Sequence, residues 1–444
     1  MSFFKKVFAN SGSKTESETP PSFLPAFGRY TEINKTPAQL SYWTKAQDDF
    51  LQRKYPDSFN NLLLYMYDPA VDNIKINRNG NQIDFELIQG SKIIRGSAND
   101  TSFKAEARIA RFDKLSVAFL RKLMTTNFML QYSRFAIKDD IIYLKFDSKI
   151  IDASPNKIYY SLRELALKSD KMDDMLVREF ASLHQIDSDH IVDLPDDIKE
   201  IKYKYLQLWL NEILEKIAAL DESKLSGGIS YMLLGFLFRI DYLLIPQGSL
   251  FDDIDKINAI YNAKDNKSTL ERNRLMIEEL KVLQGKDKNY FLNNFYDAKL
   301  TFGYVPATSH QHFYEFILDG FKNTGWYLDN RYDQIVTAIY EWIIGYSIFY
   351  FGLFPPTYDF LKIAYMVLQP EFCKEMGLTQ NLYDKTTNTF NIDAVESEIQ
   401  KVIAAHINEY PKIIILTGNI KYDSINAFLY SYLNEITYLN FAKV

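Results

Sequence analysis

The stretch from Ser154 to Phe180 gathers the residue types that general acid–base chemistry uses. It carries Asp170, Asp173, Asp174 and Glu179. Neighbouring carboxylates can divide the roles of proton donor and proton acceptor between them. The alternative is that they form the solvated face of a packing helix, and the positions of the apolar residues decide between these two interpretations.

A helix is predicted to begin at this point, because Ser154 is a good N-cap and Pro155 suits the first helical position. Apolar residues then recur at a spacing that makes one stripe along the helix, at Ile158, Leu162, Leu165, Met172, Leu176 and Phe180. The carboxylates fall largely off this stripe, and Asp174 has Arg178 four residues on, a pairing that stabilises helices. We therefore predict a solvated acidic face rather than a catalytic site.

The strongest metal-ligand candidates are His310, His312 and Glu315 in the stretch "SHQHFYE". The two histidines share a side if the segment is extended, whereas Glu315 follows His312 at a helical spacing. A metal site needs three or four convergent ligands, and no single backbone conformation brings these together. Ser309 is a good N-cap, so we predict a helix start here and expect neither a bound metal nor another cofactor.

No other motif completes a catalytic constellation. The segment from Pro411 to Ser424 resembles a strand leading into a phosphate loop, but Gly418 is its single glycine, so we expect Gly418 to cap a helix or end a strand. His184, His190 and His406 lack a visible Ser or Cys partner with an orienting acid. The chain is therefore predicted not to be an enzyme.

The composition is that of a folded chain with an excess of aromatic residues. Its 444 residues are 47% hydrophobic and 24% charged, with 31 Tyr and 32 Phe against 17 Gly and 14 Pro. Aromatic side chains favour broad packing surfaces, including those between proteins. The codon usage of a low-GC genome would produce the same excess.

The net charge and the cysteine content limit which classes of partner and which cellular compartment we expect. Lys plus Arg number 51 against 57 Asp plus Glu, a net charge of -6, and no basic tract stands out, so nucleic acid is not a favoured partner. Cys373 is the single cysteine. It excludes an internal disulfide framework and suits a reducing compartment, so we expect a cytoplasmic protein of bacterial type in which this thiol is buried or incidental.

The N-terminal third is predicted to be an α+β domain. Residues 1–37 are expected to form a mobile tail and linker without a secretory signal, although the segment from Phe3 to Phe8 could act as an amphipathic anchor. A helix with Leu40, Trp43, Phe50 and Leu51 as buried candidates follows, and Pro56 is expected to interrupt it.

Strands are predicted next, in alternating runs with a turn at Asn79–Gly80. A short helix, a second hairpin turning at Asp139–Asp140, and the helix from Ser154 complete the order α-βββ-α-ββ-α over residues 38–185. We expect the helices to lie on an antiparallel sheet.

This element order and the run "IIYLKFDSKIIDASPNKIYYSLRELALKSDKMDDMLVREF" resemble the type III secretion chaperone-like fold, closest to its YbjN-like branch. In particular, "LRELALKSDKMDDML" is similar to the leucine, alanine–aspartate and paired-leucine phrase of that branch. The resemblance covers about a third of the chain. It implies a protein that binds other proteins, commonly as a dimer that holds an extended segment of a partner. The long C-terminal region departs from the pattern of that family.

Residues 198–444 are predicted to form an all-α domain, joined to the first by the acidic linker 186–197, which contains "DSDHIVDLPDD". Within it, the segment from Ile335 to Phe354 is 20 residues long with Glu341 as its only charge. That length could span a bilayer. Because a carboxylate is costly in hydrocarbon, we expect a buried core helix instead.

The sequence thus predicts a non-enzymatic adaptor, chaperone or assembly component of a secretion, surface-assembly or defence system. It would hold an extended or helical segment of another protein, by strand addition or in a groove, with a homodimer as a further option. The candidate contact residues are Phe85, Leu87, Phe103 and Ile109, if their face of the sheet is left partly open, and Tyr340, Trp342, Tyr346 and Tyr350 on the helical domain.

Two other classes of protein stay open. One is a metal- or nucleotide-dependent enzyme or regulator with a pocket between the domains, whose polar groups would be His310, His312 and Glu315. The other is a membrane-associated component of a complex that uses the segment from Ile335 to Phe354 or the segment from Phe3 to Phe8.

Overall fold

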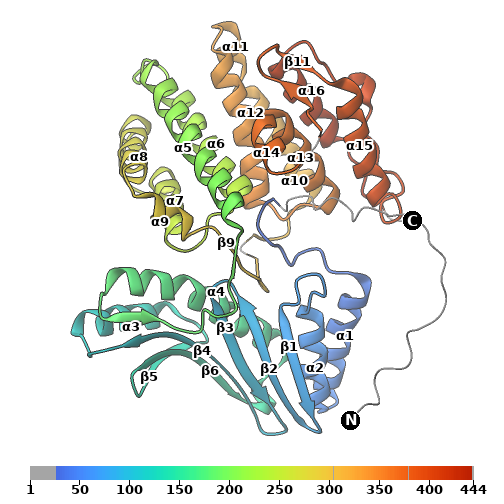
Figure 1. The fold of residues 1–444 in the computed structure, drawn as a ribbon. Helices are drawn as coiled ribbons and strands as arrows, with labels where there is room; N and C mark the ends of the chain where they lie inside the picture. The colour runs from blue at the N-terminus through green and yellow to red at the C-terminus, as the bar shows by residue number, and fades with distance from the viewer. Residues whose placement is uncertain (1–26, 304, 379, 443–444) are drawn as a thin grey trace, which may run out of the picture.

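The chain folds into two halves, which lie one above the other in Figure 1. The computed structural model describes residues 27–303, 305–378 and 380–442. The lower half is an antiparallel sheet with flanking helices, and the upper half is mostly helical. This confirms the predicted α+β domain fused to a mainly helical domain.

All the strands of the main sheet pair antiparallel. In chain order they are β1 (Ile74–Asn79), β2 (Gln82–Gln89), β3 (Lys92–Ala98), β4 (Ser102–Phe112), β5 (Arg134–Lys138), β6 (Ile141–Lys149) and β7 (Leu183–Gln185). Their spatial order is β1-β2-β3-β4-β6-β5, with β7 added to β4. The predicted turns are confirmed, since Gly80 and Asp139 have the positive φ values, 59° and 56°, that tight hairpins need.

One face of the sheet is covered by α2 (Tyr55–Met66) and α4 (Pro155–Glu179). Between them lies a single apolar core, to which each strand contributes alternate residues. The other face is charged and carries cross-strand ion pairs such as Arg95–Glu86 and Lys145–Glu106. The helix α3 (Val117–Met129) lies beside β5 at one edge of the sheet.

The start of the domain differs from the prediction in two respects. The predicted interruption is present but lies before Pro56 and divides the segment into two helices: α1 (Pro37–Leu51) ends before Arg53, whose φ of 61° is left-handed, and Pro56 lies in the first turn of α2. Four strands precede α3, whereas three were predicted. The strand that the prediction missed is β3, whose apolar and polar residue types do not alternate as those of its neighbours do. Leu40 and Leu51 are 52% and 80% exposed, so the prediction that they are buried is wrong. Both lie on the outer side of α1, which contacts the domain chiefly through α2.

The upper half contains twelve α-helices within the described ranges. They are α5 (Asp196–Ala218), α6 (Ser226–Leu244), α7 (Gly248–Asn262), α8 (Thr269–Gln284), α9 (Lys288–Leu292), α10 (His310–Lys322), α11 (Gly325–Asp329), α12 (Asp333–Tyr350), α13 (Pro355–Leu368), α14 (Pro370–Glu375), α15 (Ile392–His406) and α16 (Ile425–Thr437). Short strand pairs are also present, so the half is mainly rather than wholly helical: β8 (Val192–Asp193) with β9 (Tyr296–Asp297), and β10 (Tyr383–Asp384) with β11 (Thr389–Phe390).

The centre of this half is the packed pair α6 and α12. A Cβ added at Gly345 of α12 would lie 2.4 Å from Cβ of Phe238 on α6, so this approach requires glycine. Glu341 of α12 forms a two-pronged ion pair with Arg239 of α6, with both N–O distances 2.6 Å. The segment from Ile335 to Phe354 therefore packs inside the helical half. The helix α6 is long and apolar enough to cross a membrane, and most of it is buried in the same core.

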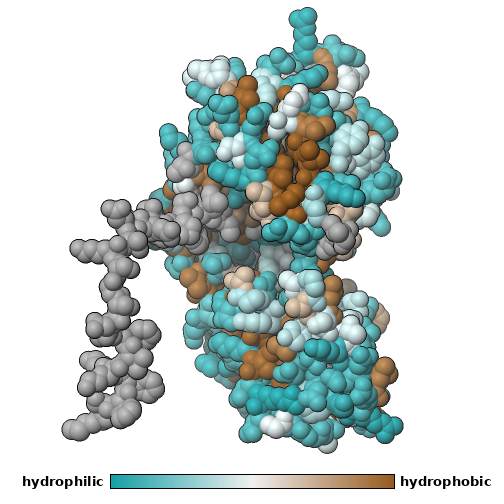
Figure 2. All heavy atoms as spheres, turned by 90° about the vertical axis from the view of Figure 1, so that its right-hand side faces the viewer, coloured by the Kyte–Doolittle hydropathy of each residue, from teal (hydrophilic) through white to brown (hydrophobic). Residues whose placement is uncertain are grey.

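The two halves exchange segments of chain. Residues 27–36, which we call the strap, leave the α+β half and bond to the helical half, with Gly28 N–H donating to the Tyr242 carbonyl at 2.8 Å. In the other direction, the segment after β9 returns to the sheet and buries Phe302 in the core of the α+β half. Figure 2 shows the two halves meeting at a narrower waist.

These exchanges correct part of the predicted domain organisation. Residues 27–36, predicted to belong to a mobile tail and linker, are packed between the halves, while the segment from Phe3 to Phe8 lies outside the described residues. The predicted linker 186–197 is bound to the sheet through Asp187, which pairs with Arg95 of β3 and Arg108 of β4.

Candidate functional site

A cavity of about 530 Å³ lies between the two halves. Its walls come from the strap, α4, the end of α6, the start of α7, the segment around β9, the end of α12 and α13. Six carboxylates line it, those of Asp170, Asp174, Asp241, Asp252, Asp255 and Asp359. Three cations line it as well, those of Arg29, Lys171 and Lys362. The cavity is therefore acidic, and it falls in the size range of small-molecule sites.

Asp170 and Asp174 of α4 line this cavity and Asp173 is buried, so the prediction of a solvated face is wrong for these three carboxylates. Glu179 is exposed, as predicted, and pairs with Lys122. One side of α4 packs on the sheet through the predicted apolar stripe, and Ser154 caps its start as expected. Its other side packs against α7, where Lys171 pairs with Asp255 and Arg178 with Asp253. Arg178 thus pairs across the two halves and not along its own helix.

A buried polar network lies beneath this wall of the cavity. Asp173 and Lys92 form an ion pair of 2.7 Å in which both side chains are 0% exposed. The Lys92 ammonium also donates to the carbonyls of Ile109 and Ile186. The Ser91 hydroxyl donates to Asp173 and lies 3.1 Å from Asp170. Lys92 therefore neutralises the deepest of the three α4 carboxylates.

Two carboxylates in the cavity have strongly raised pKa values. Burial, with Asp173 close by, raises the pKa of Asp170 to about 7. Burial and the nearby charges of Asp173 and Asp170 raise the pKa of Asp174 to about 8. Groups with such shifts in a cleft are candidates for function, because holding them there costs stability.

We expect Asp174→Asn to raise the free energy of unfolding by about 1–3 kcal/mol at about pH 9. The native pKa of about 8 lies above the ordinary value of 3.8, so the native state binds more protons between these values and loses stability as pH rises through them. The asparagine does not titrate, so the gain in free energy of unfolding over the wild type should be smaller at about pH 4. Urea denaturation at the two pH values checks this.

Asp170, Asp173, Asp252 and Lys92 act electrostatically on Asp174, so the effect of Asp174→Asn includes the loss of these interactions. The exposed Asp147→Asn is the matched control. An equal effect of both substitutions, or no dependence on pH, would contradict the assignment of a raised pKa to Asp174.

Most of the other charged groups of the cavity are paired. Arg29 of the strap donates to Asp241 at 2.7 Å and to the Pro246 carbonyl at 2.7 Å, and its guanidinium lies 4.2 Å from the centroid of the Phe251 ring. Asp359 lies 2.6 Å from Nε2 of His406. The carboxyl groups of Asp174 and Asp252 have neither a hydrogen bond nor an ion pair among the described residues.

The predicted metal-ligand candidates do not line the cavity, and their side chains have separate partners. Nε2 of His310 lies 2.8 Å from the Thr437 carbonyl, and burial lowers the pKa of His310. The ring of His312 packs edge-on against Phe351, and Glu315 accepts a hydrogen bond from Gln311. Ser309 caps α10 as predicted. In the described parts of the chain, no group of three or more His, Cys, Asp or Glu is placed to hold a metal ion.

The predicted contact residues of the sheet are buried. Phe85, Leu87, Phe103 and Ile109 are at most 3% exposed and belong to the core beneath α2 and α4. The condition on which they were chosen, an open face of the sheet, is not met, because two helices cover that face. They cannot contact a partner in this structure.

The aromatic candidates of the helical half fill the space between α6, α10 and α12. Trp342 packs against Tyr231 of α6 and Phe316 of α10, and Tyr346 stacks on Phe316. Tyr340 is 2% exposed, and the Tyr350 hydroxyl accepts a hydrogen bond from Asn258. Core packing explains all four residues.

The remaining chemical candidates have structural positions. Cys373 is buried, as expected, and burial raises its pKa to about 12, so it does not have the properties of a reactive thiol. Gly418 lies in a short 3-10 helix at Thr417–Asn419, and the segment before it pairs with no strand in the described part of the chain.

Sequence reasoning missed most of the cavity. Arg29, Asp241 and Asp252 come from three separate segments, and no spacing relates them. One signal was present, since Lys171 and Arg178 alternate with the carboxylates of α4, a pattern that also suits a charged interface between helices. Searches against protein-family models and curated proteins find no match to this chain.

Proposed function

We propose that this protein is a non-enzymatic adaptor that binds a segment of a partner protein at the outer edge of β5 and the neighbouring face of α3. The observation that carries the proposal is the exposure of large apolar side chains on this helix. Phe128 is 94% exposed, Met124 and Val117 are 72% exposed, and Met129 is 69% exposed. Contiguous exposed apolar side chains mark interaction sites, whereas single ones need no explanation.

The adjoining strand offers backbone groups to a partner. β5 pairs only with β6, so its second edge is free of any strand in the described ranges. On that edge the Phe135 N–H donates to the Asn127 side chain. Ile137 lies two residues further along the strand, so its backbone groups point to the same edge as those of Phe135, and Ile137 is 40% exposed. An extended segment could add to such an edge. The opposite edge strand, β1, is mostly exposed and polar, which suits solvent.

The charge of this surface indicates the chemistry of the partner. Residues 114–138 carry Lys114, Arg121, Lys122, Arg134 and Lys138 and no acidic residue, in a chain of net charge -6. Only Lys122 has an acidic partner in the described structure, Glu179. The partner segment should therefore combine apolar anchors with carboxylates. The resemblance to secretion chaperone-like proteins, which bind other proteins, adds support.

We expect Phe128→Glu to weaken partner binding at least about tenfold, because it replaces the most exposed apolar side chain of this surface by a carboxylate. Its effect on stability should be within about 0.5 kcal/mol, since the side chain is exposed. Photo-crosslinking from position 128 in the native host, followed by mapping of the crosslinked peptide, identifies the bound segment. Val282, 62% exposed on α8, is the control position.

An acidic segment of another protein, crosslinked from position 128 and not from position 282, would support the proposal. A crosslink to a second copy of this chain would replace the adaptor by a homodimer. Equal crosslinking from both positions would show that the surface has no special role.

A further inference from the structure

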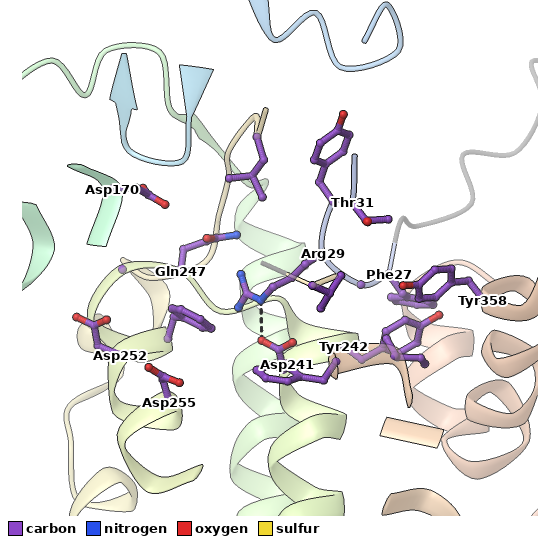
Figure 3. A pocket seen from close by; sticks show the side chains of 18 of the residues that line it. Phe27, Arg29, Thr31, Asp170, Asp241, Tyr242, Gln247, Asp252, Asp255 and Tyr358 are labelled. Atoms are coloured by element: carbon purple, nitrogen blue, oxygen red, sulfur yellow. Dashed lines mark hydrogen bonds and ion pairs between the residues drawn. The ribbon is translucent and has the colours of Figure 1, made fainter. Parts of the chain in front are cut away.

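The cavity between the halves has two chemically different ends, and the proposed adaptor surface does not involve them. Figure 3 shows Asp170, Asp252 and Asp255 on one side of the cavity. Phe27, Tyr242 and Tyr358 lie on the other side. A ligand that matches both ends carries positive charge at one end and an apolar body at the other.

The acidic end has two carboxyl groups that the described residues do not satisfy by a hydrogen bond or a close ion pair, although Lys171 and Arg178 act on Asp252 from a distance. Asp255 is paired with Lys171, but Asp174 and Asp252 have no partner among the described residues. On the other side of the cavity, near Phe27 and Tyr358 (Figure 3), the buried Thr31 hydroxyl also has no partner among the described residues. Because the protein leaves these polar groups without a partner, they are available to bond a molecule in the cavity.

The protein's own Arg29 shows what these walls can bind. Its guanidinium lies over the Phe251 ring and bonds to a carboxylate and a carbonyl, Asp241 and Pro246. An ion pair, a backbone acceptor and an aromatic face together recognise organic cations. Asp252 and the Tyr296 ring also line the cavity, so a second cation would meet the same kinds of group there.

The other end would orient the ligand. Lys362 lies there with its ammonium 5.5 Å from the centroid of the Phe27 ring, and it would repel a second cation. The cation of a ligand is thus directed toward Asp174 and Asp252, and its apolar body toward Tyr242 and Tyr358.

We propose that this cavity binds an organic ammonium ion with an apolar body, held by Asp174 and Asp252. A bare metal ion fits less well, because the carboxylates among the described residues do not converge in a group of three or more that could hold one. The same ammonium chemistry occurs in a free amine and in the lysine side chain of a peptide. The experiment distinguishes these two sources.

The test is isothermal titration calorimetry on the full chain with three probes. They are 2-phenylethylamine, its neutral analogue 2-phenylethanol, and a short peptide with one central lysine. We expect an ammonium probe to bind at least about tenfold more tightly than the alcohol, because only the ammonium pairs with the carboxylates. Asp174→Asn and Asp252→Asn should each weaken it at least about tenfold, whereas Asp147→Asn on the exposed face of β6 should not.

Tight binding of the free amine assigns the cavity to a small molecule, and binding of the peptide alone assigns it to a protein segment. Equal affinity for amine and alcohol would overturn the proposal. So would unchanged amine binding by the two cavity variants, or no binding of either ammonium probe to the folded chain. Because Asp174→Asn is expected to be at least as stable as the wild type, loss of binding by this variant would not be explained by misfolding.

Discussion

Replacing Lys92 by methionine is expected to destabilise the α+β half by about 3–5 kcal/mol at neutral pH. The Lys92 ammonium pairs with Asp173 in a site where both side chains are 0% exposed, and it also satisfies two backbone carbonyls. Methionine fills much the same volume without these bonds, so Asp173 would be left as an uncompensated buried charge. Urea denaturation followed through the fluorescence of Trp43, the tryptophan of this half, measures the loss.

The pH dependence of this loss separates a charge effect from a packing effect. Burial already raises the pKa of Asp173, and Lys92 opposes that rise. Without Lys92 the carboxyl would take up a proton more readily, so the destabilisation should be smaller at about pH 5 than at about pH 8. The double variant Lys92→Met with Asp173→Leu should recover most of the stability. A single variant as stable as the wild type at both pH values would contradict this account.

Replacing Glu341 by alanine is expected to destabilise the helical half by a similar amount, about 3–5 kcal/mol. Glu341 is 5% exposed and binds the Arg239 guanidinium through both carboxylate oxygens. Arginine does not lose its proton in proteins, so the remaining charge cannot be relieved by titration. Unlike the loss at Lys92, this one should hardly change between about pH 5 and pH 8.

The measurement uses a second reporter. The Arg239 guanidinium lies 5.3 Å from the Trp209 ring, so the fluorescence of the helical half follows the loss of this pair. Glu341→Gln, which keeps the shape and removes the charge, should lie between alanine and wild type. If Glu341→Ala and Glu341→Gln lower the free energy of unfolding by the same small amount, the Arg239–Glu341 pair orients the two helices and does not stabilise the fold.

The elements with strong local signals could be predicted from sequence. Ser154 and Pro155 placed the start of α4, and the turns at Gly80 and Asp139 followed from residues that accept positive φ. The strand β3 could not be found this way, because apolar and polar residue types do not alternate from Lys92 to Ala98 and one of the buried positions is a lysine.

The cavity could not be predicted for a different reason. A charged helix face looks the same in sequence whether it meets water or another charged helix, and α4 meets α7. Its partners, Arg29 and Asp252, lie far from Asp174 along the chain. Only the docking of the two halves brings them together, and no local propensity encodes that docking.

The burial of Phe302 bears on how the chain is made. Phe302 is 0% exposed in the core of the α+β half, its ring meets Tyr159 edge-on at 5.6 Å, and its backbone N–H and carbonyl both bond to the Gln89 side chain. A chain emerging from the ribosome presents the whole sheet and α4 more than a hundred residues before Phe302 arrives. Although domains commonly fold in order as they are synthesised, this one stays incomplete until part of the helical half has been translated. A fragment ending near residue 185 would therefore leave a hole in its core.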